Sequence, residues 1–315
     1  MIHPPPGPIG VLCGGPSRER EISVRSGEAV HRGLLSLGLP SILLALPSEV
    51  DCVPEQIRSK GVNCAFIALH GSFGEDGTLQ AVLEEMGIAY TGSGPEACRY
   101  GMDKVASRRR WLAADLPIPK WRPAGPENAL ARAGELGFPL VLKPVAQGSS
   151  FGISLVDAPE QLPQAVQVAS AFGNEWILEE YLPGLELTVG ILQDQPLPVI
   201  QVVPKRRFYD YTAKYTPGMT EYLVPAPLDG ETTRRVQQIA LRAHETLGCR
   251  SFSRVDLILA DGLGPVLLEL NPIPGLTQTS LLPKAAAAAG ISFPELCRQM
   301  LASAWDRSLR VVGAR

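Results

Sequence analysis

Two apolar segments toward the end of the chain carry polar side chains at alternate positions. Segments 253–259 and 266–271 are separated by the turn-forming residues 261–264, and this arrangement predicts a β-hairpin. A hairpin folded about the Gly262–Leu263 bond pairs residue 256 with 269 and residue 254 with 271. Because side chains alternate between the two faces of a strand, four polar side chains then share one face: Arg254, Asp256, Glu269 and Asn271.

The two carboxylates on this face indicate its chemistry. Asp256 lies directly opposite Glu269 in the predicted hairpin, and like charges in that arrangement destabilise a sheet. A divalent cation would remove the conflict. Oxygen ligands from Asp, Glu and Asn suit Mg²⁺, which proteins hold with one or two carboxylates together with substrate phosphates. A solvated polar face beside an arginine salt bridge is the alternative explanation of the same pattern.

A second candidate is the segment LKPVAQGSSFG at 142–152. Lys143 ends an apolar strand, and a flexible loop containing Gly148, Ser149 and Ser150 leads to the next strand at 153–156. Backbone N–H groups and hydroxyls of such a loop can hold phosphate oxygens, with the lysine as a point charge. The segment lacks the Gly-Lys-Ser/Thr of a Walker A motif, and an ordinary hairpin turn is the alternative.

The glycine-rich turn that begins segment 14–23 is a third candidate. A turn of this kind that enters a helix can bind an anion at the helix N-terminus, although the G-x-G-x-x-G pattern is absent. Glu19 is suited instead to hold an ammonium group. Simple capping of the helix by Ser17 and Glu21 is the alternative.

Two further features stand at predicted loop positions. The aromatic and polar segment 208–215 is typical of a lid over a site, or of a packed surface loop. His70 follows the predicted strand 64–69, at the end of a parallel strand where open sheets place ligand-binding residues. A histidine with a purely structural role is the alternative there.

The elements that position these residues form three sections. Strands at 9–13, 41–46 and 64–69 alternate with helices, which predicts a parallel, doubly wound sheet in residues 1–92. The section 93–178 opens with a helix that holds Met102, Asp103 and Lys104. The section 179–315 contains strands, a helix at 231–247, the hairpin and terminal helices. The predicted fold class is therefore α/β.

Composition excludes several classes of protein. A length of 315 residues suggests two domains, one fewer than the motifs indicate, and 45% apolar residues exclude a disordered chain. A net charge of −3 argues against a nucleic-acid partner. Six cysteines without a Cys-x-x-Cys pair argue against a zinc site. Without a long apolar run or a signal peptide, we expect a cytoplasmic protein that does not bind membranes.

Taken in order, the motifs resemble one family. The series GGxSxExExS, ALHGxxGEDG, YTGS, MDK, KPxxxGSSxG, EEYLxGxE, YDYxAKY, RVD and ELNPIPGLTxTSLLP is similar to that of the D-alanine–D-alanine ligase family of the ATP-grasp superfamily, from Gly10 almost to the C-terminus. The resemblance implies an ATP-grasp fold in which an N-terminal parallel-sheet domain (1–92) precedes two α+β subdomains (93–178 and 179–315) that clasp ATP.

The resemblance also implies an activity. Such ligases use ATP to phosphorylate the carboxylate of one D-alanine, and the amine of a second D-alanine displaces phosphate from the D-alanyl phosphate. The dipeptide product serves peptidoglycan synthesis. The implied cofactors are ATP and two Mg²⁺ or Mn²⁺ ions, and the implied assembly is a homodimer. Two alternatives stay open. One is an ATP-grasp ligase with another acceptor, D-lactate included, and the other is a non-catalytic nucleotide-binding regulator.

The resemblance assigns roles to individual residues. The residues implied to bind ATP are Lys104 and Lys143 at the phosphates, Glu179, Glu180, Tyr181 and Leu182 at adenine, Glu186 at the ribose, and Phe208. The implied metal ligands are Asp256, Glu269 and Asn271. Glu180 stands where a lysine is frequent in the family, and Asn271 precedes Pro-Ile-Pro-Gly rather than the commoner Thr-x-Pro-Gly.

Substrate and catalytic roles follow in the same way. The residues implied at the first D-alanine are Glu19 at its ammonium group, His70 near its carboxyl end, and Ser149 and Tyr215 as hydrogen-bonding partners. Arg254 and the Gly275 N–H would stabilise the oxyanion. The second substrate would meet Lys214, Ser280 and Leu281. The tyrosine at 215 indicates an amine nucleophile, because the related D-lactate ligases typically place histidine in that region.

Overall fold

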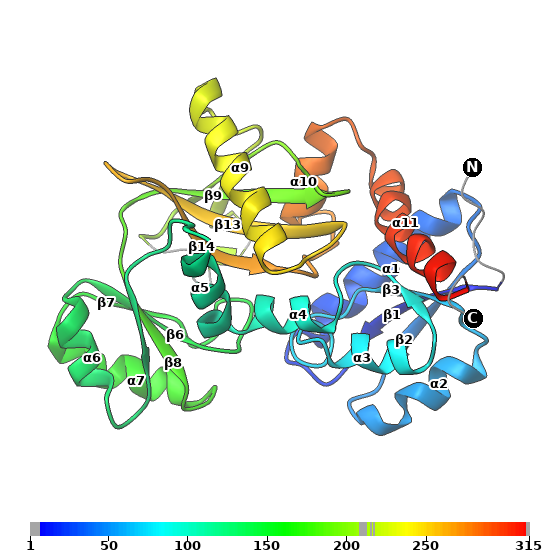
Figure 1. Cartoon of the computed structure of the whole chain (residues 1–315), viewed down its shortest axis with the longest axis horizontal. Coiled ribbons are helices and arrows are strands. Elements are labelled where there is room, and N and C mark those ends of the chain that lie inside the picture. Colours follow the sequence, from blue (N-terminus) through cyan, green and yellow to red (C-terminus); the bar gives the residue numbers. More distant parts are fainter. Residues whose placement is uncertain (1–6, 208–212, 215, 217, 313–315) are drawn as a thin grey trace.

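Three β-sheets with helices packed against them make up the fold (Figure 1). The computed structural model describes residues 7–207, 213–214, 216 and 218–312, with the backbone alone for 306–312. The predicted α/β fold, with a parallel N-terminal sheet followed by two further sheets, is confirmed.

The N-terminal sheet has the strand order β2-β1-β3-β4, and all its pairs are parallel. Its strands are β1 (Ile9–Gly14), β2 (Ser41–Leu46), β3 (Cys64–Ile67) and β4 (Ala89–Tyr90). Parallel neighbours need crossover connections, which contain α1 (Arg20–Ser36), a 3₁₀ turn (Val50–Cys52), α2 (Val53–Ser59) and α3 (Thr78–Glu85). The central strand β1 is buried throughout, which explains its unbroken apolar run.

The central sheet is antiparallel, in the order β5-β8-β6-β7. Its strands are β5 (Trp121–Ala124), β8 (Trp176–Glu180), β6 (Leu140–Pro144) and β7 (Ser154–Val156). Two helices and a 3₁₀ turn accompany it: α6 (Ala129–Leu136), Pro159–Gln161 and α7 (Leu162–Ser170). Buried Trp176 and Leu142 pack with Ala133 and Ala165 in the core between sheet and helices.

Helices α4 (Pro95–Met102) and α5 (Lys104–Ala113) precede this sheet. The predicted single helix through Met102, Asp103 and Lys104 is wrong, because Asp103 is extended and its side chain accepts the N–H groups of Val105 and Ala106. An aspartate that caps a helix in this way starts a new helix instead of continuing the old one. The break aims the Lys104 side chain from the first turn of α5.

The third sheet has the order β12-β11-β9-β13-β14, with β10 paired to β9. Its strands are β9 (Gly184–Leu192), β10 (Gln195–Pro196), β11 (Ile200–Pro204), β12 (Thr220–Leu223), β13 (Phe252–Ala260) and β14 (Gly264–Asn271). The helices of this part are α9 (Gly230–Thr246), α10 (Leu281–Ala288) and α11 (Phe293–Val312).

The β13–β14 hairpin has the predicted pairs, Arg254 with Asn271 and Asp256 with Glu269. Its turn differs from the prediction, because Ala260 pairs with Gly264 and the fold is centred on Gly262. The register shifts next to Asp256, where Leu268 is the extra residue of β14. A β-bulge of this kind bends a strand locally and redirects its side chains.

The sheets are not independent along the chain. Helix α11 packs against α1 and β4, and Figure 1 shows α11 beside α1 at the right of the molecule. This helix therefore helps to cover the N-terminal sheet. One hydrophobic core joins Val11 and Leu34 to Leu282 and Met300. The predicted boundary at 178 falls inside β8, and the division into 1–92, 93–178 and 179–315 stays a prediction.

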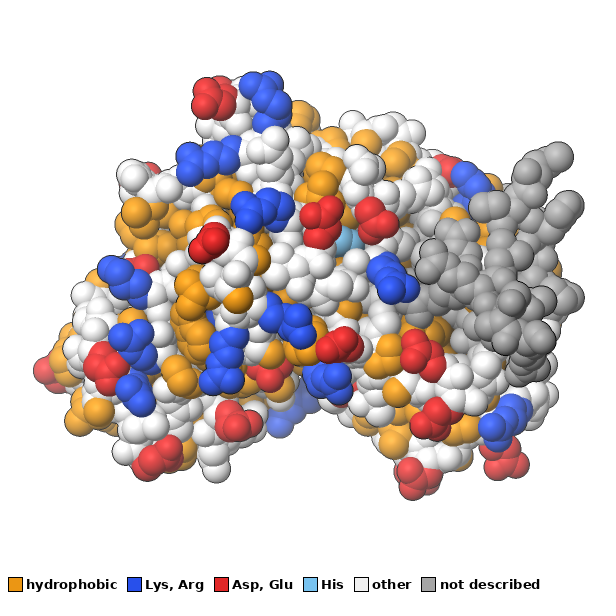
Figure 2. Space-filling model, viewed as in Figure 1, with side chains coloured by type: hydrophobic (Ala, Val, Ile, Leu, Met, Phe, Trp, Pro, Cys, Tyr) orange, Lys and Arg blue, Asp and Glu red, His pale blue; other side chains and the backbone are white. Residues whose placement is uncertain are grey.

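The surface carries charges of both signs. On the face seen in Figure 2, lysine and arginine side chains are interspersed with aspartate and glutamate. The most exposed large apolar side chains lie far apart in the sequence, with Leu112 on α5, Leu130 on α6 and Leu263 in the turn between β13 and β14. Within the described ranges, every helix is too short or too polar to cross a lipid bilayer.

Candidate active site

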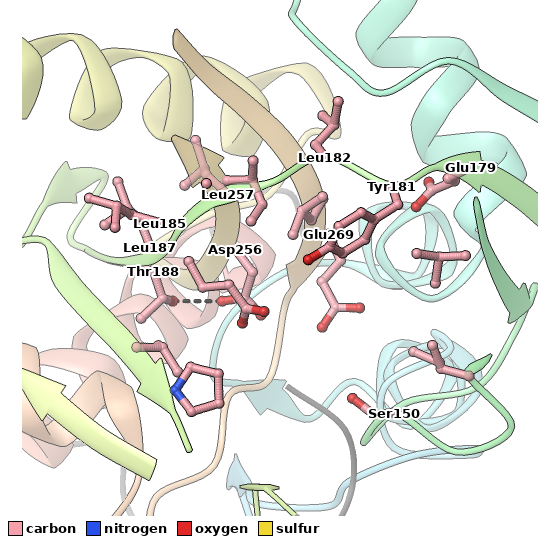
Figure 3. Close-up of a pocket in the computed structure, with 18 of the residues that line it drawn as sticks. Ser150, Glu179, Tyr181, Leu182, Leu185, Leu187, Thr188, Asp256, Leu257 and Glu269 are labelled. Atoms are coloured by element: carbon pink, nitrogen blue, oxygen red, sulfur yellow. Dashed lines mark hydrogen bonds between the residues drawn. The ribbon is translucent and has the colours of Figure 1, made fainter. Parts of the chain in front are cut away.

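Two adjoining cavities contain all the predicted site residues that the structure describes. The first, of about 310 Å³, lies between the central and third sheets (Figure 3). Its predicted lining residues are Lys143, Glu179, Glu180, Tyr181, Leu182, Glu186, Lys214, Asp256 and Glu269. The second, of about 190 Å³, is lined by Glu19, His70, Lys104, Ser149, Lys214, Arg254, Glu269, Asn271, Gly275, Ser280 and Leu281. Phe208 and Tyr215 lie outside the described residues.

Two residues line both cavities, Lys214 and Glu269. They therefore mark the place where a molecule in one cavity would meet a molecule in the other. Lys104, which the family resemblance assigns to ATP phosphates, lines the second cavity, and its Nζ donates to the Gln147 carbonyl at 2.7 Å.

The hairpin face carries an ion pair within the predicted metal set. Arg254 donates from Nε and Nη2 to the two Asp256 carboxylate oxygens at 2.9 and 2.7 Å, and its Nη2 lies 3.9 Å from Glu269 Oε1. Thr188 on β9 donates to Asp256 Oδ1 at 2.6 Å. Figure 3 shows both carboxylates directed into the cavity. The arginine thus offsets the like-charge conflict that the facing strands create.

A metal site here would use carboxylate and amide oxygens. Among the described residues, no group of three or more His, Cys, Asp and Glu side chains is placed to hold a metal ion. The predicted set instead combines Asp256 and Glu269 with the amide of Asn271, whose Oδ1 accepts the Ile273 N–H at 2.8 Å. All three offer oxygen atoms, which fit a hard cation such as Mg²⁺.

Positive charges gather around Glu269. Burial alone would raise its pKa, but the cations Lys214, Lys104 and Arg254 outweigh burial and hold the pKa well below its usual range. Burial has the opposite effect on Lys104, lowering the pKa of its ammonium group to about 8, with a smaller contribution in the same direction from Lys143. Both cavities therefore meet at a carboxylate that stays ionised among several cations.

A buried charge cluster stands behind the first cavity. Arg108 on α5 donates to Glu179 Oε1 through Nε, at 2.7 Å, and through Nη2. Lys143 donates to the other oxygen of Glu179. Burial would raise the pKa of Glu179, yet Arg108 and Lys143 outweigh it and lower the pKa. The Arg108 guanidinium also donates to the carbonyl of Leu268, the extra residue of the β14 bulge.

Sequence reasoning did not find Arg108. It begins the run Arg108-Arg109-Arg110, which on a helix is typical of a solvated face, and Arg109 and Arg110 are indeed exposed. Arg108 itself is fully buried. No local pattern distinguishes it from its neighbours, because its partners come from segments about 70 and 160 residues away along the chain.

The glycine-serine loop meets the N-terminal section through Glu19. Ser149 donates a hydrogen bond to the Glu19 carboxylate, and Ser149 and Ser150 both have a positive φ, which is uncommon for residues other than glycine. Burial, and then the neighbouring Glu75, raise the pKa of Glu19. Helix α1 has no side-chain cap hydrogen bond from its N-cap residue Glu19. The Ser17 hydroxyl accepts the Glu19 N–H at 3.1 Å and donates to the His70 carbonyl. Glu19 is therefore turned toward the cavity.

Gly275 and Ser280 lie close together at the far side of the second cavity. A Cβ added to Gly275 would stand 2.8 Å from Ser280 Oγ, a distance that needs the hydroxyl to move. The Ser280 hydroxyl accepts the Thr277 N–H at 3.1 Å, and Ser280 precedes the first residue of α10. Glycine at position 275 therefore lets the backbone lie close to the Ser280 hydroxyl, and both residues line the second cavity.

The segment after β8 forms the rim of the first cavity. Glu180 Oε1 accepts the Lys120 N–H at 2.8 Å, and Glu180 Oε2 lies 3.4 Å from Lys120 Nζ. The Arg207 guanidinium stands 5.3 Å from the centre of the Tyr181 ring and pairs with Asp157 at 2.9 Å. Segments of the central and third sheets thus meet over this rim.

Comparisons with known proteins agree on one family. A family profile described as D-ala D-ala ligase C-terminus matches residues 111–302, and one described as D-ala D-ala ligase N-terminus matches residues 47–93. The chain is 44% identical to the D-alanine–D-alanine ligase of Desulforudis audaxviator, over 95% of this chain and 99% of that protein. It is also 44% identical to the one from Syntrophotalea carbinolica, over 94% and 95%.

Solved structures show the same relationship. The structure of D-alanine–D-alanine ligase from Bacillus anthracis complexed with ATP has a TM-score of 0.83 at 32% identity and covers 98% of both chains. The VanG D-Ala:D-Ser ligase from Enterococcus faecalis has a TM-score of 0.80 at 28% identity, over 95% of this chain and 99% of that one. The likeness therefore extends over all three sheets.

Proposed function

The chain belongs to the D-alanine–D-alanine ligase family, and we propose that it joins two D-alanine molecules to D-alanyl-D-alanine with conversion of ATP to ADP and phosphate. The observation that carries this proposal is the pair of cavities that share Lys214 and Glu269. A reaction that transfers a phosphoryl group from one bound molecule to another needs two such sites in contact.

The larger cavity is the proposed ATP site. Its rim, from Glu179 to Leu182, offers backbone groups and the Tyr181 ring to adenine, and Glu186 is placed along β9 for the ribose. Lys143 stands at the inner end, oriented by the buried Glu179. A bound nucleotide with its base at the rim would direct its phosphates toward Lys143, Asp256 and Glu269. The Bacillus anthracis relative, whose structure is complexed with ATP, supports ATP as the nucleotide. We assign Phe208 to this site from the family resemblance.

The proposed metal cofactor is a pair of ions, either Mg²⁺ or Mn²⁺. Asp256, Glu269 and Asn271 would hold it, since their oxygen atoms suit hard cations and the low pKa of Glu269 keeps that ligand ionised. Bound there, the metal would neutralise charge on the transferring phosphoryl group.

The first step takes place in the smaller cavity. Glu19 would hold the ammonium group of one D-alanine, with Ser149 and Tyr215 as hydrogen-bonding partners and His70 near the carboxyl end. A carboxylate oxygen of that substrate attacks the γ-phosphorus of ATP, the bond from that phosphorus to the bridging oxygen breaks, and ADP leaves. Lys104 and Lys143 supply positive charge, and the products of the step are D-alanyl phosphate and ADP.

The second step forms the peptide bond. The amine of the other D-alanine, whose carboxylate Ser280 and Lys214 would bind beside Leu281, attacks the carbonyl carbon of D-alanyl phosphate. Negative charge develops on the carbonyl oxygen, where the Gly275 N–H and Arg254 would stabilise it. Phosphate then leaves with the former carboxylate oxygen, and the amine loses a proton to the medium.

The setting of the enzyme is part of the proposal. We place it in the cytoplasm, where ATP is available, as a homodimer that supplies the dipeptide for peptidoglycan synthesis. The three sections 1–92, 93–178 and 179–315 are the proposed domains, and the three sheets support that division. A molar mass of twice that of the 33.8 kDa chain in light scattering would support the dimer.

A phosphate-release assay tests the proposed activity. We expect release that depends on both Mg²⁺ and D-alanine, with D-alanyl-D-alanine identified by mass in an amount equal to the phosphate. Parallel reactions offer D-serine or D-lactate as the second substrate, because the related VanG protein is a D-Ala:D-Ser ligase. Release at background with every acceptor would refute the ligase and favour a non-catalytic nucleotide-binding protein. A mixed product formed faster than D-alanyl-D-alanine would refute the acceptor assignment.

A further inference from the structure

The loop that carries Gly275 is hydrogen-bonded to the N-terminal section of the chain. Residues 272–276 follow β14, and the N–H of Leu276, next to Gly275, donates to Ser26 Oγ at 3.3 Å. Ser26 belongs to α1 in the N-terminal section and is 250 positions away along the chain. One hydroxyl of the N-terminal section therefore fixes the peptide unit that follows Gly275.

The His70 imidazole in turn contacts the Ser26 hydroxyl. Its Nε2 lies 3.0 Å from Ser26 Oγ, within hydrogen-bond distance. A hydroxyl oxygen has two lone pairs, so Ser26 can accept from Leu276 and from His70 at once. The loop is thus held next to Gly275, at Leu276, by a hydroxyl that His70 contacts.

Glu75 fixes the other edge of the imidazole. Its Oε1 lies 3.4 Å from His70 Nδ1, and its Oε2 accepts the Gly71 N–H at 2.8 Å. The second bond ties the carboxylate to the backbone beside His70, which orients the ring. Burial alone would lower the pKa of His70, but Glu75 and then Glu19 and Ile273 outweigh burial and raise it.

The three side chains that hold this loop, Ser26, His70 and Glu75, are buried. Ser26 is 0% exposed, His70 4% and Glu75 6%. Buried hydrogen bonds of this kind polarise one another and resist exchange with water, so a displaced member leaves polar groups without partners. The orientation of the loop then depends on every member of the series.

We propose that Ser26 and Glu75 are positioning residues of the ligase reaction, which act through His70 to keep the Gly275 N–H aimed at the developing oxyanion. The inference rests on the proposed function, because the oxyanion belongs to that reaction. It concerns neither the metal nor the nucleotide, so the two substitutions should slow turnover and leave the binding of ATP as it is.

Ser23 provides a matched control. It lies one turn before Ser26 on α1 and is equally buried. Its hydroxyl donates to the Ala68 carbonyl and accepts the Gly14 N–H, both at 2.8 Å, so all its partners belong to the N-terminal sheet and the loops beside it. Ser23→Ala and Ser26→Ala each remove one buried hydroxyl from the same helix, but only Ser26→Ala releases the loop of Gly275.

The experiment measures kcat, the KM for ATP and the melting temperature of both variants. Loss of an oxyanion donor slows catalysis roughly 100- to 1,000-fold, and Ser26→Ala leaves the donor present but loosely held. We therefore expect kcat to fall about tenfold relative to Ser23→Ala, with the KM for ATP unchanged and similar melting temperatures. Equal kcat values in the two variants, or a tenfold rise in the KM for ATP of Ser26→Ala, would overturn the inference.

Glu75→Gln provides a second route should Ser26→Ala fail to fold. Glutamine can still accept the Gly71 N–H but carries no charge for His70, and we expect a several-fold lower kcat at an unchanged KM for ATP. If both act through His70, the double variant should lose less than the product of the two single losses. Wild-type kcat in Glu75→Gln, or fully multiplicative losses, would contradict the shared route. A wild-type enzyme that makes no dipeptide would refute the proposed function itself.

Discussion

Replacement of Arg108 by methionine removes the charge that Glu179 faces at the base of the proposed ATP site. Methionine fills much of the same volume, so the change tests the guanidinium more than the packing. In the wild type the guanidinium makes two hydrogen bonds to one carboxylate oxygen of Glu179 and one to the Leu268 carbonyl. Both side chains are almost completely buried.

The expected loss of stability follows from these contacts. Removal of one partner from a buried ion pair costs about 3–5 kcal/mol, and Glu179 keeps Lys143 as a second cation, which places Arg108→Met near 3 kcal/mol. An unfolding entropy of about 2 cal/mol/K per residue gives roughly 0.7 kcal/mol/K for 315 residues. The melting temperature should therefore fall by about 4–5 °C if the chain unfolds as one unit.

Acid unfolding gives an independent check on the same contact. The pKa of Glu179 in the folded protein lies below the ordinary value of 4.5. Its ion pairs therefore contribute stability that is fully present above about pH 4.5 and is lost as the pH falls through the lower, folded-state pKa. In Arg108→Met that pKa moves up, so the stability lost between pH 5 and pH 3 should be smaller than in the wild type.

Calorimetry at pH 7 and at lower pH, together with the KM for ATP, measures these effects. Arg109→Met is the control, since Arg109 is the next residue on α5 and is exposed. We expect the control to stay within 1 °C of the wild type. Arg108→Met should bind ATP several-fold more weakly, because Arg108 no longer fixes the Glu179 carboxylate that contacts Lys143. A melting temperature of Arg108→Met equal to that of the control would refute the electrostatic reasoning.

Three further predictions concern the cavities. Glu269→Gln should abolish turnover and weaken Mg²⁺ binding at least tenfold in titration calorimetry while the melting temperature stays within a few degrees; retained activity would exclude Glu269 as a ligand. The kcat/KM for ATP should fall as the pH rises through about 8, where the Lys104 ammonium becomes neutral, and Lys104→Arg should remove that alkaline decline; an unchanged profile in the variant would assign it to another group. Gly275→Ala should raise the KM for the second D-alanine about tenfold, because the new Cβ would stand 2.8 Å from Ser280 Oγ; unchanged acceptor kinetics would contradict the placement of Ser280.

The hairpin illustrates what alternation in a sequence can predict. The pairs 254–271 and 256–269 followed from the spacing of polar residues, and the structure confirms them. The turn was predicted half a residue away from its observed centre at Gly262, and the bulge at Leu268 absorbs the difference. Nothing in the apolar run 265–268 marks a bulge, and the partner of the Leu268 carbonyl, Arg108, lies far away in the sequence.

Local geometry was predictable where a short pattern decides it. Strand β2 begins and ends at the predicted residues, and β13 extends one residue beyond the predicted segment 253–259 at each end. The break at Asp103 was missed, although aspartate before a helical run is a typical start signal, because the residues on both sides of it read as one helix. The hydrogen-bonded contacts that run from Glu75 through His70 and Ser26 to Leu276 could not be predicted from the sequence, since they join segments that only the folded chain brings together.

The central claim is that the carboxylate of one D-alanine is phosphorylated before the peptide bond forms. D-Alanine labelled with ¹⁸O in its carboxyl group tests this claim most directly, with the released phosphate analysed by mass spectrometry. We expect one ¹⁸O atom in each phosphate, because the attacking oxygen leaves with phosphorus, and one ¹⁸O in the new peptide carbonyl. Phosphate without label, released in step with dipeptide, would contradict it.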